Sequence, residues 1–173
     1  MYKVCALQQF SAMELIETTE GKTRFFIPVQ DNTTQFPPGS APIFFNRRME
    51  LNRDVTVLLL SVLKPSEYLD AMGATGIRGM RVQNECGIPV TINDREPEAI
   101  DLITYNAFRA NLPVEIVQRD ASALMSERSF DAVDLDPFGT PAMVIDAAIR
   151  GTRRFLSVTA TDTAPLCGAH LKA

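Results

Sequence analysis

From residue 46 onward, the chain alternates short apolar segments with longer segments of helical character. Strands are predicted at 68–69, 90–93, 114–117, 130–135 and 155–161, and helices at 46–63, 77–86, 97–109, 122–128 and 141–151. Strands separated by helices of about ten residues form right-handed βαβ units and a parallel sheet. We therefore expect an α/β fold whose ligands bind beyond the carboxyl ends of the strands.

The first 45 residues differ from the rest of the chain. Residues 18–23 predict a turn that leads into a short strand at 24–29. Residues 31–42 are rich in Pro, Gly, Ser, Thr and Asn, which predicts a loop. We expect an extension over 1–45 with short strands and a Pro-rich loop, followed by one domain over 46–173. The apolar residues of 55–63 are expected in the core of that domain.

The composition is typical of globular proteins. With 173 residues, of which 46% are hydrophobic and 22% charged, the chain can bury about two-thirds of its unfolded surface. No apolar run approaches the ~18 residues of a membrane span, and residues 1–10 lack the features of a secretory signal. Cys5, Cys86 and Cys167 form no C-x-x-C pair. We expect free thiols in a reducing cytoplasm, or in a nucleus or mitochondrion if the source is eukaryotic.

The charge of the chain leaves its partner open. A net charge of −4 argues against a protein that binds nucleic acid over its whole surface. Local basic clusters occur at Arg47, Arg48 and Arg53 and again over 150–154. A solvated helix face explains each cluster at least as well as a nucleic-acid contact does.

A glycine-rich segment at 70–79 follows the first strand of the predicted sheet. Gly73, Gly76 and Gly79 follow the pattern G-x-x-G-x-x-G instead of G-x-G-x-x-G, which argues against a nicotinamide cofactor. Glycine allows the backbone to turn sharply and to approach a ligand at the amide end of the next helix. The alternative is that these glycines serve only a tight turn between strand and helix.

Acidic residues follow the next two predicted strands. Asp94 is placed to accept hydrogen bonds from ribose hydroxyls, and Asp120 is placed to accept one from an adenine amino group. Taken singly, each of them also suits a helix cap. Three acids, Asp70 included, at the ends of three successive strands favour a ligand site.

The segment Asp136-Pro137-Phe138-Gly139 follows the fourth strand of the predicted sheet. A carboxylate, a rigid proline turn and an aromatic ring suit a flat base that carries an amino group. Asp134 points to the same side as Asp136 if the strand persists, because side chains alternate along a strand. It then serves either as a second acid of the site or as a partner of a nearby arginine.

Several motifs in this order resemble a known family. The glycine loop with Asp94 and Asp120-Ala121 resembles the cofactor loops of Rossmann-like S-adenosylmethionine-dependent methyltransferases. The whole set resembles the tRNA (guanine(26)-N2)-dimethyltransferase family. The segments that carry this resemblance are Phe44–Met49, Ala74–Gly79, Asp136–Gly139, Val158–Asp162 and Pro165–His170.

The resemblance implies a fold, a reaction and a set of site residues. The fold is a Rossmann-like methyltransferase sheet with five of its seven strands present. The reaction is methylation of the N2 amino group of guanine 26 in tRNA, with S-adenosyl-L-methionine as the cofactor and no metal. Asp136, Pro137 and Phe138 are the implied catalytic residues. The implied cofactor contacts are Arg48, Asp70, Gly73, Gly76, Arg78, Asp94, Asp120 and Ala121.

Two features depart from the family pattern. Asn46-Arg47-Arg48 replaces the usual Asn-Pro-Arg, which keeps Arg48 in register with a less rigid turn before it. The chain also stops before two expected strands and the tRNA-binding domain, which predicts a fragment with an open edge at its fifth strand.

Alternative functions stay open at this stage. A methyltransferase that acts on adenine or cytosine in DNA, or on another guanine in RNA, shares the Asp136–Gly139 segment. A module that binds the cofactor without turnover also fits. His170 has no neighbouring metal ligands, Cys167 has no adjacent base, and Asp162 suits either the base pocket or a turn.

Overall fold

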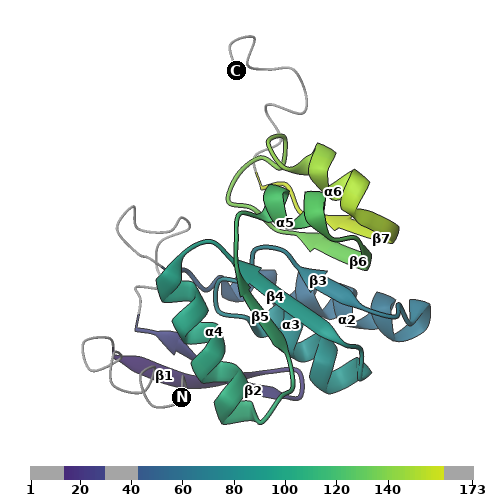
Figure 1. The fold of residues 1–173 in the computed structure, drawn as a ribbon. Coiled ribbons are helices and arrows are strands. Elements are labelled where there is room, and N and C mark those ends of the chain that lie inside the picture. Colours follow the sequence, from purple (N-terminus) through teal and green to yellow (C-terminus); the bar gives the residue numbers. More distant parts are fainter. Residues whose placement is uncertain (1–13, 30–42, 162–173) are drawn as a thin grey trace.

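The computed structural model describes residues 14–29 and 43–161 (Figure 1). Within these ranges, a five-stranded parallel sheet has the order β5-β4-β3-β6-β7. Its strands are β3 (Tyr68–Asp70), β4 (Val90–Asp94), β5 (Glu115–Gln118), β6 (Phe130–Leu135) and β7 (Thr152–Val158). The predicted α/β fold with a parallel sheet is confirmed.

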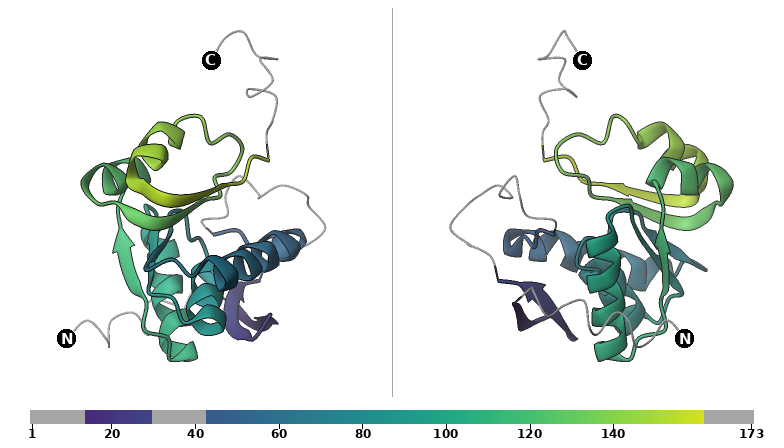
Figure 2. Two further views of the ribbon diagram at one scale, coloured as in Figure 1. Left: turned by 90° about the vertical axis from the view of Figure 1, so that its right-hand side faces the viewer. Right: turned by 60° about the vertical axis from the view of Figure 1, so that its left-hand side comes forward.

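Helices cover both faces of the sheet (Figure 2). They are η2 (Arg47–Met49), α2 (Glu50–Leu63), α3 (Ile77–Arg81), its π-helical continuation η3 (Val82–Cys86), α4 (Pro97–Ala110), α5 (Ala121–Glu127) and α6 (Ile145–Gly151). Apolar side chains of α2, α3 and α4 form one core cluster with β3 and β4, and those of α5 and α6 form another with β3 and β6. Among the described residues, no helix is long and apolar enough to span a bilayer.

Local signals fix most helix ends. The side chain of Asn46 accepts a hydrogen bond from the backbone N–H of Arg48 at 3.0 Å, so Asn46 caps the helical segment that is predicted to begin at this residue. Lys64 adopts a left-handed conformation and ends α2. Two predicted elements have bounds that are wrong by three residues or more. Helix α6 begins at Ile145 because residues 141–144 form a turn closed on the carbonyl of Pro141, and β7 begins at 152 and ends at 158.

The N-terminal part of the described chain is an antiparallel hairpin of β1 (Leu15–Glu20) and β2 (Thr23–Pro28). The predicted turn at 18–23 is shorter in the structure. Residues 18–20 belong to β1 and pair with β2, so only residues 21–22 form the turn. Phe25 and Ile27 are buried in the same core cluster as β3 and β4. The hairpin therefore shares the core of the sheet, while the predicted domain boundary at residue 45 stays a prediction.

A buried ion network attaches the hairpin to α2 and α3. Glu20 receives two hydrogen bonds from the guanidinium of Arg53, at 2.7 and 2.5 Å, and one from Arg81 at 2.9 Å. All three side chains are at most 7% exposed. Because buried charges are costly without partners, these contacts fix where the hairpin sits.

Replacing Glu20 with Gln is expected to lower the free energy of unfolding by about 3 kcal/mol, because the buried guanidinium of Arg53 then faces a neutral amide. Arg81 keeps its ion pairs with Asp54 and Glu85. Glu17→Gln is the matched control, since Glu17 pairs with Arg24 at 3.7 Å on the exposed side of the hairpin. The control is expected to change stability by less than about 0.5 kcal/mol. Urea unfolding of both variants measures the difference, and equal losses would contradict the role given to Glu20.

Candidate active site

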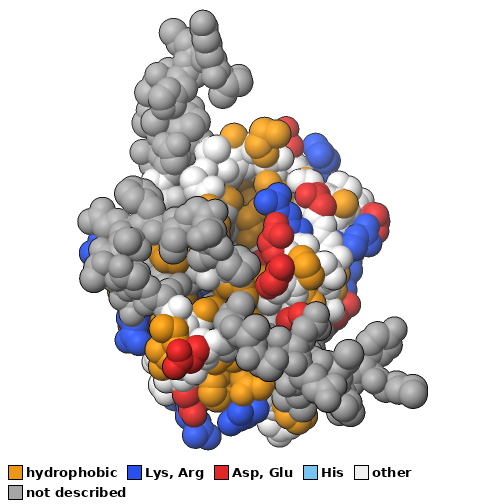
Figure 3. Space-filling view, turned by 90° about the vertical axis from the view of Figure 1, so that its left-hand side faces the viewer, with side chains coloured by type: hydrophobic (Ala, Val, Ile, Leu, Met, Phe, Trp, Pro, Cys, Tyr) orange, Lys and Arg blue, Asp and Glu red, His pale blue; other side chains and the backbone are white. Residues whose placement is uncertain are grey.

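The carboxyl edge of the sheet gathers the residues that the sequence singled out. Figure 3 shows the side of the molecule on which this edge lies, where acidic side chains border an apolar hollow. The loop after β3 approaches the end of β4, since the backbone N–H of Gly73 donates to the carbonyl of Asn93 at 2.8 Å and that of Ala74 donates to Asp94 Oδ2 at 2.9 Å. The predicted glycine loop and Asp94, the predicted acceptor for the ribose hydroxyls, are thus in direct contact.

The glycines of this loop are needed for packing. A Cβ at Gly73 would lie 2.5 Å from Ile92 Cγ2, and a Cβ at Gly76 would lie 3.1 Å from Ile103 Cγ1. Gly76 also has a φ of +79°, a conformation that favours glycine. Both glycines therefore let the loop lie tightly against β4 and α4, as expected if they serve a tight turn between strand and helix. This packing also places the loop at the carboxyl edge of the sheet.

Asp94 and Asp120 both make the backbone contacts expected of caps. Asp94 Oδ1 accepts from the N–H of Glu96 at 3.0 Å, just before α4, and Asp120 Oδ1 accepts from the N–H of Ala123 at 2.9 Å in the first turn of α5. These contacts orient the carboxylates and leave acceptor sites available for a ligand, because each carboxylate has about four lone-pair sites. Ala121 is buried behind Asp120, and Arg48 is exposed on η2.

Arg78 lies at the centre of the polar network and is 5% exposed. Its Nε lies 3.4 Å from Asp134 Oδ1, its Nη1 donates to Thr56 Oγ1 at 2.9 Å, and its Nη2 pairs with Asp136. Burial acts to lower the pKa of Arg78, but the neighbouring carboxylates, Asp134 first, raise it above its usual value. The interpretation of Asp134 as the partner of a nearby arginine is confirmed.

Asp70 faces inward, beneath the candidate site. Its side chain is 2% exposed, and its Oδ2 accepts from the backbone N–H of Gly79 at 2.9 Å. Burial raises the pKa of Asp70 to about 7, although Arg78 acts in the opposite direction. Asp70 is therefore placed to hold the start of α3, and it reaches the carboxyl edge only through the backbone of the loop.

The segment that follows β6 carries the exposed groups of the site. The Asp136 side chain is 24% exposed, and the Phe138 ring is 69% exposed. Gly139, with a φ of +89°, donates its N–H to Thr161 Oγ1 at 3.1 Å, which attaches the segment to the residues that follow β7. A carboxylate and an aromatic ring thus lie side by side on a braced turn, as the sequence predicts.

Sequence reasoning did not assign a role to Phe44. Its ring centroid lies 5.9 Å from that of Phe138, with the planes inclined at 57°. The two phenylalanines are 94 positions apart, so only the tertiary structure brings them together. The sole signal in the sequence is the position of Phe44 within the segment Phe44–Met49.

Three predicted residues cannot be placed. Asp162, Cys167 and His170 lie outside the described residues, as do Cys5 and the predicted loop at 31–42. Within the described ranges, no group of three or more His, Cys, Asp or Glu side chains is arranged to hold a metal ion.

The raised pKa of Asp70 predicts a pH-dependent stability. The folded carboxyl keeps its proton up to about pH 7, while an ordinary carboxyl releases it near pH 3.8, so the folded chain loses stability as the pH rises through this window. Asp70→Asn is expected to flatten the slope of unfolding free energy against pH by up to about 1.4 kcal/mol per pH unit. Asp146→Asn, an exposed change on α6, should leave the slope unaltered. Identical slopes for the two variants would refute the assignment.

Comparison with known proteins identifies relatives of the chain. A family model described as N2,N2-dimethylguanosine tRNA methyltransferase matches residues 21–173. A tRNA (guanine(26)-N(2))-dimethyltransferase of Methanoregula boonei is 73% identical over 161 residues, which are 93% of this chain and 43% of that relative. The chain therefore spans less than half the length of this relative.

Solved structures agree with the sequence match. The structure of Trm1 from Pyrococcus horikoshii with S-adenosyl-L-methionine is 41% identical, has a TM-score of 0.75, and is matched over 90% of this chain and 45% of that one. The Methanocaldococcus jannaschii tRNA m1G37 methyltransferase, at 16% identity and a TM-score of 0.65 over 83% of this chain and 41% of that one, shares the fold. By the extent of the family match, the chain belongs to the N2,N2-dimethylguanosine tRNA methyltransferase family.

Proposed function

We propose that this chain forms the methyl-transfer site of a tRNA (guanine(26)-N2)-dimethyltransferase. The observation that carries the proposal is the position of Asp136, which directly follows β6 at the carboxyl edge, pairs with Arg78 at the start of α3 and precedes Phe138 by two residues. Such an edge is where ligands bind in open parallel sheets. The family match and the activity for which the relatives are named support the same assignment.

The donor half of the site has the chemistry that S-adenosyl-L-methionine requires. Asp94 is oriented by two backbone N–H groups and retains lone pairs for ribose hydroxyls, and Asp120 retains lone pairs for the adenine amino group. The loop with Gly73 and Gly76 leads to the amide end of α3, beside Arg78. When bound, this cofactor supplies an electrophilic methyl group; Arg48, Arg78 and Ala121 complete the proposed set of contacts, and Asp70 supports it from below.

The acceptor half of the site, around Asp136, has to activate a weakly nucleophilic amine. The lone pair of a guanine N2 amine is delocalised into the ring, so the amine is a weak nucleophile. The carboxylate of Asp136, with the carbonyl of the Pro137 segment, accepts hydrogen bonds from the amine hydrogens, localises the lone pair and aims it at the methyl group. The second methylation requires that the remaining N–H again face Asp136.

Arg78 and Phe138 support Asp136 in this task. Arg78 pairs with one of its oxygens and fixes the direction of the carboxylate. The ring of Phe138 is proposed to stack on the base, and the ring of Phe44 lies next to that of Phe138. A guanine must leave its stack to reach these rings, at a cost of a few kcal/mol that aromatic stacking offsets.

The proposal concerns the activity of the whole protein. The chain spans 43% of the length of the Methanoregula boonei relative, so tRNA as the partner and the order of the two methylations belong to the proposal. The cytoplasm stays the predicted location.

Asp136→Asn is expected to reduce methyl transfer to tRNA by about 10²–10⁴-fold, because the amide accepts fewer hydrogen bonds and carries no charge. The measurement is mass spectrometry of nucleosides from treated tRNA, which separates N2-methylguanosine and N2,N2-dimethylguanosine from methylated adenine or cytosine. Asp131→Asn, on the same strand but paired with Arg154 at 3.1 Å away from the site, is the matched control. Methylation of another base would replace the proposal with a different amino-methyltransferase.

Phe138→Ala is expected to weaken the use of tRNA by about 1–3 kcal/mol, or roughly 5- to 150-fold in kcat/KM, through lost stacking. Met143→Ala is the matched control, because Met143 is 88% exposed on the same loop and offers no ring. Equal effects of the two substitutions would mean that the loop, and not the ring, recognises the base.

A further inference from the structure

Asn93 is a buried asparagine near the carboxyl end of β4, and it is 1% exposed. Its Nδ2 group donates one hydrogen bond to the carbonyl of Ala71 at 2.9 Å and one to the carbonyl of Arg119 at 3.1 Å. Its Oδ1 accepts a hydrogen bond from the backbone N–H of Arg119, also at 3.1 Å. Because an asparagine side chain offers two N–H donors and one acceptor oxygen, each of its groups has a partner.

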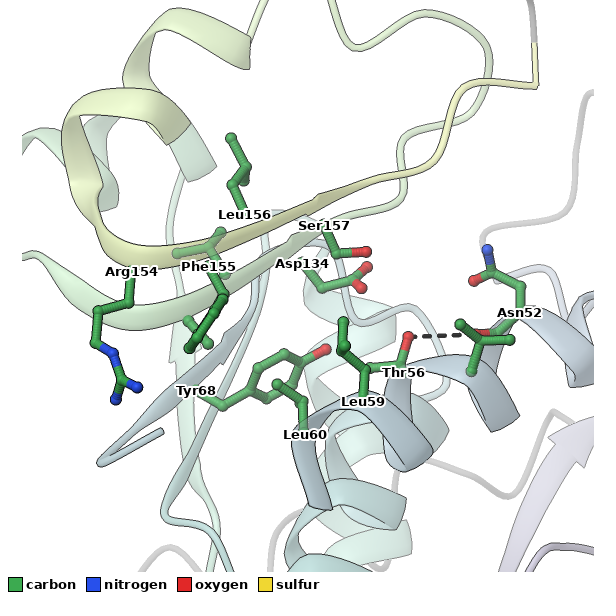
Figure 4. Close-up of a pocket in the computed structure, with 13 residues that line it drawn as sticks. Asn52, Thr56, Leu59, Leu60, Tyr68, Asp134, Arg154, Phe155, Leu156 and Ser157 are labelled. Atoms are coloured by element: carbon green, nitrogen blue, oxygen red, sulfur yellow. Dashed lines mark hydrogen bonds between the residues drawn. The ribbon is translucent and has the colours of Figure 1, made fainter. Parts of the chain in front are cut away.

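A complete set of partners is not general among the side-chain amides of this structure. Asn52 lies on α2, in the wall of a cavity of about 360 Å³ that β6 and β7 also line (Figure 4). Its side-chain oxygen has no hydrogen-bond partner among the described residues. By contrast, Asn93 makes all three contacts with backbone groups, so the chain around it is arranged to receive an amide.

The contacts of Asn93 cross the sheet. Ala71 directly follows β3 and Arg119 directly follows β5, while β4 lies between these two strands. Strands β3 and β5 therefore share no backbone ladder, and the side chain of Asn93 links their ends. The N–H of Arg119 also reaches the carbonyl of Asp94 at 3.2 Å, but the carbonyl of Arg119 is held by the Asn93 amide.

This link joins the segments that carry the two acidic residues of the proposed donor site. Asp94 follows Asn93 in the chain, and Asp120 follows Arg119. The N–H of Ala74, in the glycine loop, donates to the Asp94 carboxylate at 2.9 Å. The spacing between the two carboxylates therefore depends on the side chain that joins the ends of their strands.

We infer that Asn93 is a positioning residue of the donor site, which sets the spacing between Asp94 and Asp120. The inference rests on the proposed function, in which Asp94 receives the ribose and Asp120 the adenine of the cofactor. Two acceptors at a fixed spacing favour a ligand whose ribose and base reach both at once, because the loops then lose less freedom on binding. At 1% exposure, Asn93 acts through the backbone of these loops and not through contact with the ligand.

Cofactor affinity of paired substitutions tests this assignment. Asn93→Asp keeps the shape of the side chain but removes both N–H donors. Asp120→Asn removes a charged acceptor and keeps a residue that can cap α5. Calorimetric titration with S-adenosyl-L-methionine gives the Kd of the native chain, both single variants and the double variant. Thr91→Val is the matched control, because Thr91 is 3% exposed on the same strand and donates to Glu115 at 2.7 Å.

The inference predicts that Asn93→Asp and Asp120→Asn each weaken binding by about 10-fold or more in the native chain. In the chain that already carries Asn93→Asp, Asp120→Asn is expected to cost less than about 3-fold, because Asp120 is no longer held at its spacing from Asp94. The control is expected to unfold at a lower urea concentration and to keep the native Kd.

The outcomes separate this inference from the proposed function. Independent losses that multiply in the double variant, or an Asn93→Asp variant with native affinity, would overturn the inference and leave the donor site in place. A folded native chain that binds no cofactor would overturn both. Asn93→Ser, which keeps one donor, repeats the cycle should Asn93→Asp fail to fold or bind too weakly to measure.

Discussion

The buried guanidinium of Arg78 is the interaction on which the site depends. It joins three parts of the fold, because Thr56 lies on α2, Asp134 on β6 and Asp136 on the turn beyond β6. A charge at 5% exposure persists only where carboxylates balance it, and Asp134 and Asp136 do so directly. The same contacts that neutralise Arg78 also set the direction of the Asp136 carboxylate, so the stability of this region and the geometry of the acceptor are linked.

The order of the elements follows from the sequence, and several details do not. The alternation of strands and helices and the extent of the helical segment 46–63 are local properties, and the structure has them where they are predicted. The start of α6 depends on the turn that is closed on the carbonyl of Pro141, and no local pattern predicts the π-helical form of η3. Strand β1 was missed because its residues 18–20 are typical of a turn, while their pairing with β2 decides their conformation.

The candidate site was predictable in its residue types and less so in its contacts. Asp94, Asp120, Asp136 and Phe138 follow strand ends, so the parallel topology alone brings them to one edge. The pairing of Arg78 with Asp134 and Asp136, the inward position of Asp70 and the approach of Phe44 to Phe138 need the tertiary fold. The sequence also does not predict that five apolar side chains of α2 are exposed, because apolar residues in a helix predict burial without identifying the neighbour that buries them. These residues are Leu51, Val55, Leu58, Leu59 and Val62.

Calorimetric titration of S-adenosyl-L-methionine into the 173-residue chain tests the central claim most directly, because it requires neither tRNA nor turnover. The account predicts binding at a single site and a loss of at least about 10-fold in affinity for Asp94→Asn, which removes a charged acceptor of the ribose hydroxyls. It also predicts that Glu98→Gln, a change in the first turn of α4, leaves the affinity unaltered. A folded native chain that binds no cofactor, or an Asp94→Asn variant with native affinity, would contradict the placement of the donor site at the carboxyl edge of the sheet.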